Sequence, residues 1–256
     1  METINIIAAL AILIFGVPHG ALDPLTAHRL GLIPSKVKIS LFMIGYLAIA
    51  SIAFYLWLIF PLFSLTIFLV ISVYHFGSDW DSKKVIDNIA YGFFVLGLPA
   101  QINPEQVETV FNYLLQGSDV GSLIFALTTC FLFSCAWLVL KIPTTKVIRI
   151  FELILLAGMA LLFDPIIYFT FFFCLLHSPR HFTHELKLIA SHNLWVVLVV
   201  VLGIMALTVI LGLIMGQTLS LKISHSNDLL ALIFIGVACL TYPHVLLIEY
   251  GKLQNI

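Results

Sequence analysis

Charged side chains are scarce in this sequence. Only 10% of the 256 residues are Asp, Glu, Lys or Arg, while 61% are hydrophobic and the mean hydropathy is +1.12. Soluble globular domains carry charge at about a quarter of their positions. The composition therefore excludes a soluble globular protein and indicates an integral membrane protein. A net charge of −1 also leaves no basic surface for nucleic acid, so no nucleic-acid partner is expected.

Cysteine motifs and a basic leader are missing as well. The four cysteines form no CxxC pair and lie in apolar segments, so we expect them to be packing residues: Cys130, Cys135, Cys174 and Cys239. The opening residues METIN carry no basic group, and no small-residue cleavage site follows them. The first apolar segment is therefore expected to remain in the membrane.

Long apolar runs recur along the whole chain. A helix needs about 20 residues to cross roughly 30 Å of hydrocarbon, and the alternating pattern of barrel strands is missing. The expected fold is all-α: a polytopic transmembrane helical bundle of seven to nine helices, forming one integral membrane domain over residues 1–256 in the cell membrane. The nine candidate segments are 3–22, 39–60, 61–78, 86–102, 121–141, 148–163, 165–182, 193–216 and 229–250. The sixth and seventh are the shortest and meet at a turn predicted at Asp164-Pro165.

The positions of Lys and Arg predict which way the helices run. With nine crossings, eleven of the twelve basic residues fall in alternate gaps, and only Lys222 falls on the other side. Short cytoplasmic loops collect positive charge. The N-terminus is therefore predicted outside and the C-terminus inside. On the outer side, apolar residues at helical spacing over 103–120 favour an amphipathic helix on the membrane, with an ordered loop as the alternative.

Histidines gather at the predicted cytoplasmic ends of three helices. They occur in PHGALD (18–23), YHFGSD (74–79) and HSPRHFTHE (177–185), which place His19, His75, His177 and His181 in one leaflet. His177 and His181 are four residues apart, as two ligands of one metal on a helix face require. Pro179 lies between them and could kink the helix. Ionisable groups inside a membrane usually mark function, so we interpret these residues as a metal site.

A carboxylate follows three of these histidines by four residues. The pairs are His19 with Asp23, His75 with Asp79, and His181 with Glu185. A metal-bound imidazole commonly donates its second N–H to a carboxylate, although spacing alone does not show that these carboxylates turn toward the rings. An all-nitrogen ligand set suits Zn, Cu, Fe or Ni.

The other five histidines have different predicted roles. Four lie in polar loops and are expected to be solvated: His28, His184, His192 and His225. His244 shares the predicted inner leaflet, and a structural role and a place in the pocket wall are equally compatible with the sequence. Aromatic residues in the run YFTFFF, 168–173, are candidates for a tunnel lining, with core or lipid-facing packing as the alternative.

The three motifs GVPHGALDP, YHFGSDW and HSPRHFTHE, in this order, resemble those of the Brp/Blh family of bacterial and archaeal β-carotene 15,15'-dioxygenases. The resemblance covers essentially the whole chain. It implies cleavage of β-carotene by O₂ at the central double bond to two molecules of retinal, which supply microbial rhodopsins. It also implies Fe(II) held by His19, His75, His177 and His181. In the implied reaction, Tyr74 and Tyr242 are candidate contacts for an oxygen intermediate.

Two other functions stay open on the sequence. A membrane desaturase or hydroxylase with a di-iron site needs around eight histidine ligands, whereas this chain has nine histidines with several in loops. A non-enzymatic metal or proton transporter needs ionisable residues through both leaflets, whereas these are concentrated in one.

Overall fold

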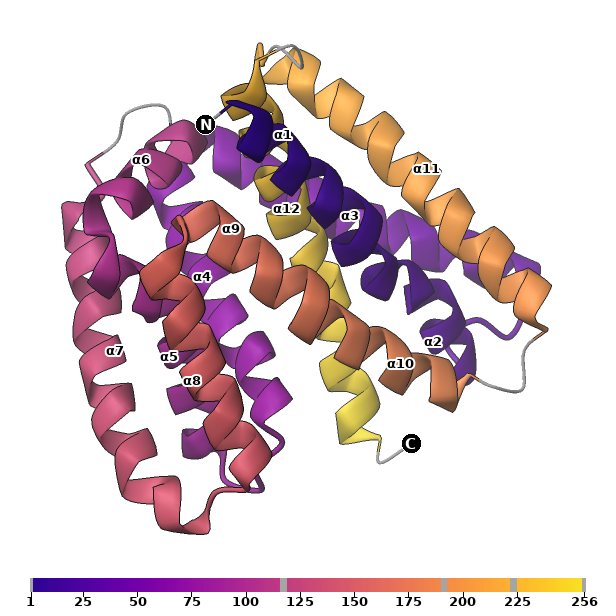
Figure 1. The fold of residues 1–256 in the computed structure, drawn as a ribbon. Helices are drawn as coiled ribbons and strands as arrows, with labels where there is room; N and C mark the ends of the chain where they lie inside the picture. Colours follow the sequence, from indigo (N-terminus) through magenta and orange to yellow (C-terminus); the bar gives the residue numbers. More distant parts are fainter. Residues whose placement is uncertain (1, 116–118, 190–192, 222–224, 255–256) are drawn as a thin grey trace. The chain divides into compact units, whose positions relative to one another are not determined.

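The computed structural model describes residues 2–115, 119–189, 193–221 and 225–254, apart from the side chains of Glu2, His19 and Lys36. Within those ranges the chain is helical and contains no strand (Figure 1). The expected polytopic helical bundle is confirmed. Seven helices of the described chain are long and apolar enough to cross a membrane: Thr3–Arg29, Val37–Ile59, Pro61–Trp80, Val85–Ile102, Gly121–Thr144, Leu194–Thr218 and Ser226–Leu253.

The chain divides into two compact units. The first comprises Met1–Phe60 together with Phe173–Ile256, and the second comprises Pro61–Phe172. The first unit is thus built from both ends of the chain, and the second is one uninterrupted stretch. The expectation of one domain over residues 1–256 stays a prediction.

The first unit packs its irregular segments between long helices. Its elements are α1 (Glu2–Ala11), the π-helix η1 (Ile12–Gly16), the 3₁₀-helix η2 (Val17–Leu22), α2 (Asp23–Arg29), α3 (Lys36–Ile59), the π-helix η5 (Phe172–His177), α10 (Ser178–Leu188), α11 (Leu194–Thr218) and α12 (Ser226–Leu253). α12 packs against α1 and α3, while α10 and α11 pack against η2. The segment that carries His19 is therefore enclosed by helices from the other end of the chain.

Two π-helical segments of the first unit meet just before histidine motifs. A Cβ atom on Gly16 would lie 2.3 Å from Cε1 of Phe173, so only glycine permits this approach of η1 to η5. The Ser178 hydroxyl donates to the carbonyl oxygen of Phe15 at 2.6 Å. Departures from α geometry disturb the normal backbone hydrogen-bond ladder, and this hydroxyl supplies a donor for one of the carbonyls. The contact holds the His19 and His177 segments in register.

The second unit is arranged around α5 (Val85–Ile102). Around it lie α4 (Pro61–Gly77), the 3₁₀-helix η3 (Ser78–Trp80), α6 (Pro104–Leu115), α7 (Gly121–Lys141), α8 (Val147–Leu162) and α9 (Pro165–Phe171); the 3₁₀-helix η4 (Ile142–Thr144) joins α7 to α8. α5 packs most extensively against α7 and α4. Gly92 makes the α4 contact possible, because a Cβ atom there would lie 1.9 Å from the backbone oxygen of Val73.

A buried polar network ties the second unit together. The Tyr91 hydroxyl donates to Glu152, whose other oxygen accepts from Arg149 at 3.0 Å. The Arg149 guanidinium lies 5.7 Å from the centre of the Trp80 ring, and that ring stacks on Tyr91. Glu152 is 5% exposed, and such a carboxylate is tolerated because both oxygens are paired.

Several sequence expectations are settled by these elements. The segment 103–120 contains a helix, α6, which buries Val107, Leu114 and Leu115, so the loop alternative is wrong. Whether α6 lies on the membrane surface stays a prediction.

The turn at Asp164 is confirmed, because α8 ends at Leu162 and α9 begins at Pro165. The segments 148–163 and 165–182 form helices but are not among the seven of spanning length. The orientation of the termini stays a prediction.

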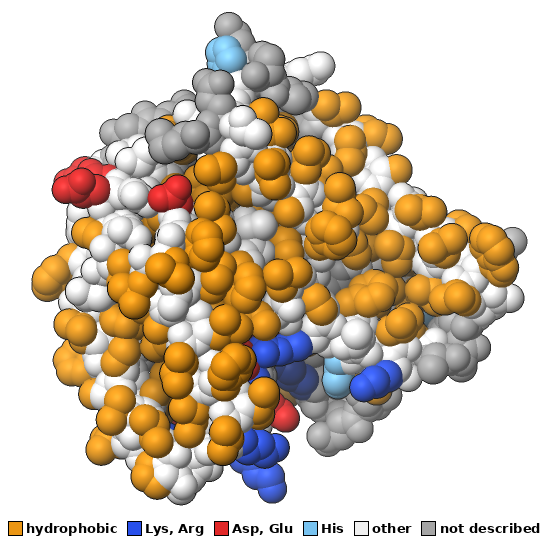
Figure 2. Space-filling view, in the orientation of Figure 1, with side chains coloured by type: hydrophobic (Ala, Val, Ile, Leu, Met, Phe, Trp, Pro, Cys, Tyr) orange, Lys and Arg blue, Asp and Glu red, His pale blue; other side chains and the backbone are white. Residues whose placement is uncertain are grey.

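Apolar side chains dominate the visible surface. Hydrophobic groups cover most of the face drawn in Figure 2, while charged groups form small separate patches. Large exposed residues include Trp195, Leu194 and Phe133, each more than 70% accessible. In water this would be a liability, whereas lipid tails solvate such a surface. All four cysteines are free; Cys174 and Cys239 are buried, which agrees with a packing role.

Candidate metal centre

His244 and Asp23 form the best-defined polar contact of the candidate site. The Nδ1 atom of His244 on α12 lies 2.9 Å and 3.0 Å from the two carboxylate oxygens of Asp23, the first residue of α2. The Tyr46 hydroxyl on α3 donates to Oδ2 of Asp23 at 2.8 Å. Asp23 is 2% exposed and His244 4%. Three helices of the first unit therefore converge on one buried carboxylate.

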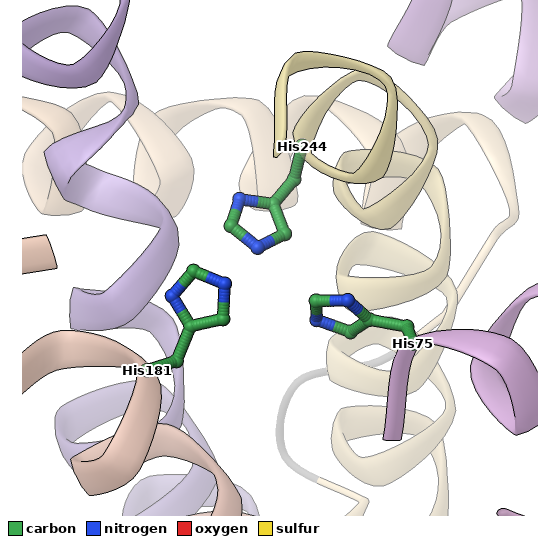
Figure 3. Close-up of side chains that lie close together, drawn as sticks. All are labelled: His75, His181 and His244. Atoms are coloured by element: carbon green, nitrogen blue, oxygen red, sulfur yellow. The ribbon is translucent and has the colours of Figure 1, made fainter. Parts of the chain in front are cut away.

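His181 lies beside His244, and the two rings belong to the same unit. Their centroids are 5.0 Å apart with an interplanar angle of 54°. The two rings face each other in Figure 3. Since the histidines come from α10 and α12, the contact joins two helices that are distant in sequence.

His177 is fully buried and lies one turn before His181. Their ring centroids are 6.1 Å apart, and His177 stacks on Phe173 at 5.7 Å. The expected kink at Pro179 is placed differently: the irregular geometry precedes it in η5, and Pro179 lies in the first turn of α10. A proline there lacks an N–H that would have no intrahelical acceptor in any case, so it begins α10 without breaking it.

His75 lies in the last turn of α4 and is 5% exposed. It belongs to the second unit, whereas His177, His181 and His244 belong to the first.

Two of the three carboxylates, Asp23 and Glu185, have described partners that the four-residue spacing did not suggest. Asp23 contacts His244 and Tyr46, as described above. Glu185 accepts from the Thr26 hydroxyl at 2.8 Å and lies 3.6 Å from Nη2 of Arg29. It therefore ties α10 to α2, and its contacts give no support to the suggested partnership with His181. The side chain of His19 lies outside the described residues.

The environment of these histidines favours cation binding. A neutral imidazole ring offers one nitrogen lone pair to a metal. The Asp23 carboxylate supplies negative charge next to one ring. Buried neutral imidazoles with an adjacent carboxylate are the donors that Zn, Cu, Fe and Ni accept, so the residues present fit a divalent transition metal.

The role of His244 and the participation of Tyr46 could not be decided from sequence. His244 had appeared equally compatible with a structural role and a pocket wall, and its pairing depends on α12 packing against α2 and α3. His28, His184 and His225 are exposed, as expected, and His192 lies outside the described residues.

The aromatic run before His177 is mostly core. Tyr168, Phe172 and Phe173 are buried, and Phe172 packs edge-on against Phe76 at 5.2 Å. A tunnel lining therefore stays a prediction. Tyr74, one of the two tyrosines suggested as contacts for an oxygen intermediate, is 42% exposed. Both contacts stay predictions.

Together these features define a polytopic helical membrane protein whose first unit contains a histidine cluster that could hold a metal. Residues 10–250 match the family model described as Beta-carotene 15,15'-dioxygenase. The chain is also 31% identical over 260 residues to "Beta-carotene 15,15'-dioxygenase" of uncultured marine bacterium 66A03, a match that covers 94% of this chain and 92% of that protein. No solved structure matches the chain. The chain belongs to the β-carotene 15,15'-dioxygenase family.

Proposed function

We propose that this protein cleaves β-carotene at its central 15,15' double bond with O₂, giving two molecules of all-trans-retinal. The observation that carries the proposal is the match to a relative named for this reaction over 94% of the chain, which includes all three histidine motifs. The retinal would supply a microbial rhodopsin in the same membrane.

The metal in this proposal is Fe(II). The ligands implied by the family resemblance are His19, His75, His177 and His181. The burial of His75 and His177 and the contact between His181 and His244 within the first unit support a metal site. When bound, a non-haem iron supplies activation of O₂, chemistry that no protein side chain provides.

The chain's own residues hold the metal, exclude water and admit the substrate. A C40 hydrocarbon dissolves in the bilayer, so helices that expose apolar side chains allow it to approach from lipid. Phe172 and Phe173 are 0% and 3% exposed and lie within four or five residues of His177. Such packing keeps water from the rings. In the proposal, the apolar walls position β-carotene so that its central double bond, and no other, lies beside the metal.

Expression in a bacterium that accumulates β-carotene tests the function. We expect the orange colour to fade and retinal to appear in cells that carry the wild-type chain. A His225→Ala variant is the matched control, because His225 has a 63% exposed side chain and lies outside the site. Cells that keep their pigment, although folded and iron-loaded protein is present in the membrane, would show that this is not the reaction.

A further inference from the structure

We propose that His244 is a further ligand of the metal and binds through Nε2, and that Asp23 and Tyr46 are the positioning residues that fix its ring. The proposal rests on the proposed function only in that a divalent metal binds beside His181. It adds a donor that the histidine motifs do not contain.

The contact with Asp23 determines which nitrogen of His244 carries the proton. An ionised carboxylate only accepts hydrogen bonds, so an Nδ1 atom at 2.9 Å and 3.0 Å from its two oxygens carries the proton. A neutral imidazole has one N–H and one lone pair. Nε2 of His244 therefore carries the lone pair, which is the form that binds metals.

Nε2 of His244 is on the side of its ring that faces His181. The two ring centroids are 5.0 Å apart, and Figure 3 shows nitrogens of His181 and His244 facing each other. Two nitrogen lone pairs that face each other repel, and a cation bound between them turns this repulsion into attraction. Both residues belong to the first unit, so this pairing is internal to one compact body.

Tyr46 fixes the carboxylate in turn. Its hydroxyl donates to Oδ2 of Asp23 at 2.8 Å, and its oxygen lies 3.5 Å from the carbonyl oxygen of Leu240, one turn before His244 on α12. The backbone of η2 passes nearby, where a Cβ added at Gly20 would be 3.9 Å from Nδ1 of His244. The ring is therefore held by Asp23 of α2, whose carboxylate is fixed by Tyr46 of α3.

The arrangement has an electrostatic consequence. A carboxylate that accepts a hydrogen bond from a metal-bound imidazole raises the basicity of that imidazole and fixes the orientation of its ring. Asp23 also places a full negative charge one ring away from a dication in a medium of low dielectric, where uncompensated charge is costly. Asp23 thus strengthens the donor without taking a coordination position.

Metal affinity of purified protein in detergent tests the proposal. The probes are Fe(II) under anaerobic conditions and Co(II), titrated into metal-free wild type and the variants His244→Ala, Asp23→Asn and Tyr46→Phe. We expect Asp23→Asn to raise Kd about 10- to 100-fold, with a smaller rise for Tyr46→Phe and the largest for His244→Ala. X-ray absorption should show fewer imidazole ligands in His244→Ala. Each sample is first checked for a single gel-filtration peak, and Tyr46→Phe is nearly isosteric, so it covers the case in which the others fail to fold.

Glu152→Gln is the matched control. It changes another buried carboxylate that accepts from a tyrosine, in the second unit. We expect it to lower the unfolding temperature while Kd stays within about twofold of wild type. If Asp23→Asn and Tyr46→Phe also keep the wild-type Kd, the Asp23–His244 pair is only structural and the proposal is overturned. An equal loss of affinity in Glu152→Gln would overturn it too.

The outcome separates from that of the proposed function. Metal binding that depends on His244 in a protein that leaves β-carotene intact supports this inference and contradicts the reaction. If the protein cleaves β-carotene but His244→Ala binds the metal with the wild-type Kd, the reaction is supported and this inference is contradicted.

Discussion

Asp23 and His244 lie 221 residues apart in the sequence, and their side chains meet at 2.9 Å in the interior of the first unit. The contact joins the start of α2 to the middle of α12, so both ends of the chain must be assembled before the site exists. Burial of such a pair is tolerated because each oxygen of the carboxylate has a donor. The same contact selects the tautomer of His244.

The metal ligands implied by the family resemblance can be tested one at a time. We predict that His75→Ala and His177→Ala each purify without bound iron, because loss of one imidazole leaves a buried site with too few donors. His225→Ala should keep its iron, since that ring is exposed. Metal analysis of the purified proteins measures this directly. Equal iron content in all three variants would show that the ligands are other residues.

Removal of the metal should destabilise the protein. A ligand that binds only the folded state stabilises it by about 2.7 kcal/mol at a free concentration 100 times its Kd. We therefore expect a chelator to lower the unfolding temperature of wild type and Fe(II) to restore it. The unfolding temperature of His177→Ala should respond to neither addition. A wild-type protein that melts at the same temperature with and without iron would contradict a buried metal site.

Gly92 is predicted to be essential for the contact between α4 and α5. Gly92→Ala would place a Cβ atom 1.9 Å from the backbone oxygen of Val73, so the helices must separate. We expect a loss of about 1–3 kcal/mol of unfolding free energy, the usual cost of overpacking, or more because the obstacle is backbone. Gly158→Ala on α8 is the control, since nothing lies within 4 Å of its Cβ position. Equal unfolding temperatures for the two variants would refute the close packing.

The orientation predicted from Lys and Arg can be measured by labelling. With the four native cysteines replaced by alanine, Lys84→Cys should be protected from a membrane-impermeant maleimide in intact cells, and Asp119→Cys should react. Lys84 precedes α5 and Asp119 precedes α7. Permeabilised cells, in which both positions should react, control for burial. The opposite labelling pattern would reverse the topology.

Much of the fold could be predicted from the sequence because lipid simplifies the physics. Apolar runs of about 20 residues must be helices, and they located most of the spans correctly. The irregular geometry of η1 and η5 was not predictable, because it depends on the approach of Gly16 to Phe173 and on the Ser178 hydroxyl. Pro179 had suggested a kink, but it lies in the first turn of α10.

The candidate site was partly predictable for a similar reason. Histidines at helix ends can be read from the sequence, and within the first unit the His181 ring lies beside His177 and His244. The carboxylate partners could not be read, because a four-residue spacing places Asp23 near His19 along the chain but does not fix its side-chain direction. His244 could not be assigned a role, since its partner comes from the other end of the chain.

One measurement tests the central claim most directly: chromatographic analysis of the products formed when purified, iron-loaded protein in detergent meets β-carotene and O₂. The account predicts two molecules of retinal for each β-carotene consumed and no fragments of unequal length, with no conversion by metal-free protein. Intact β-carotene after incubation with folded, iron-loaded protein, or fragments of unequal length, would contradict it.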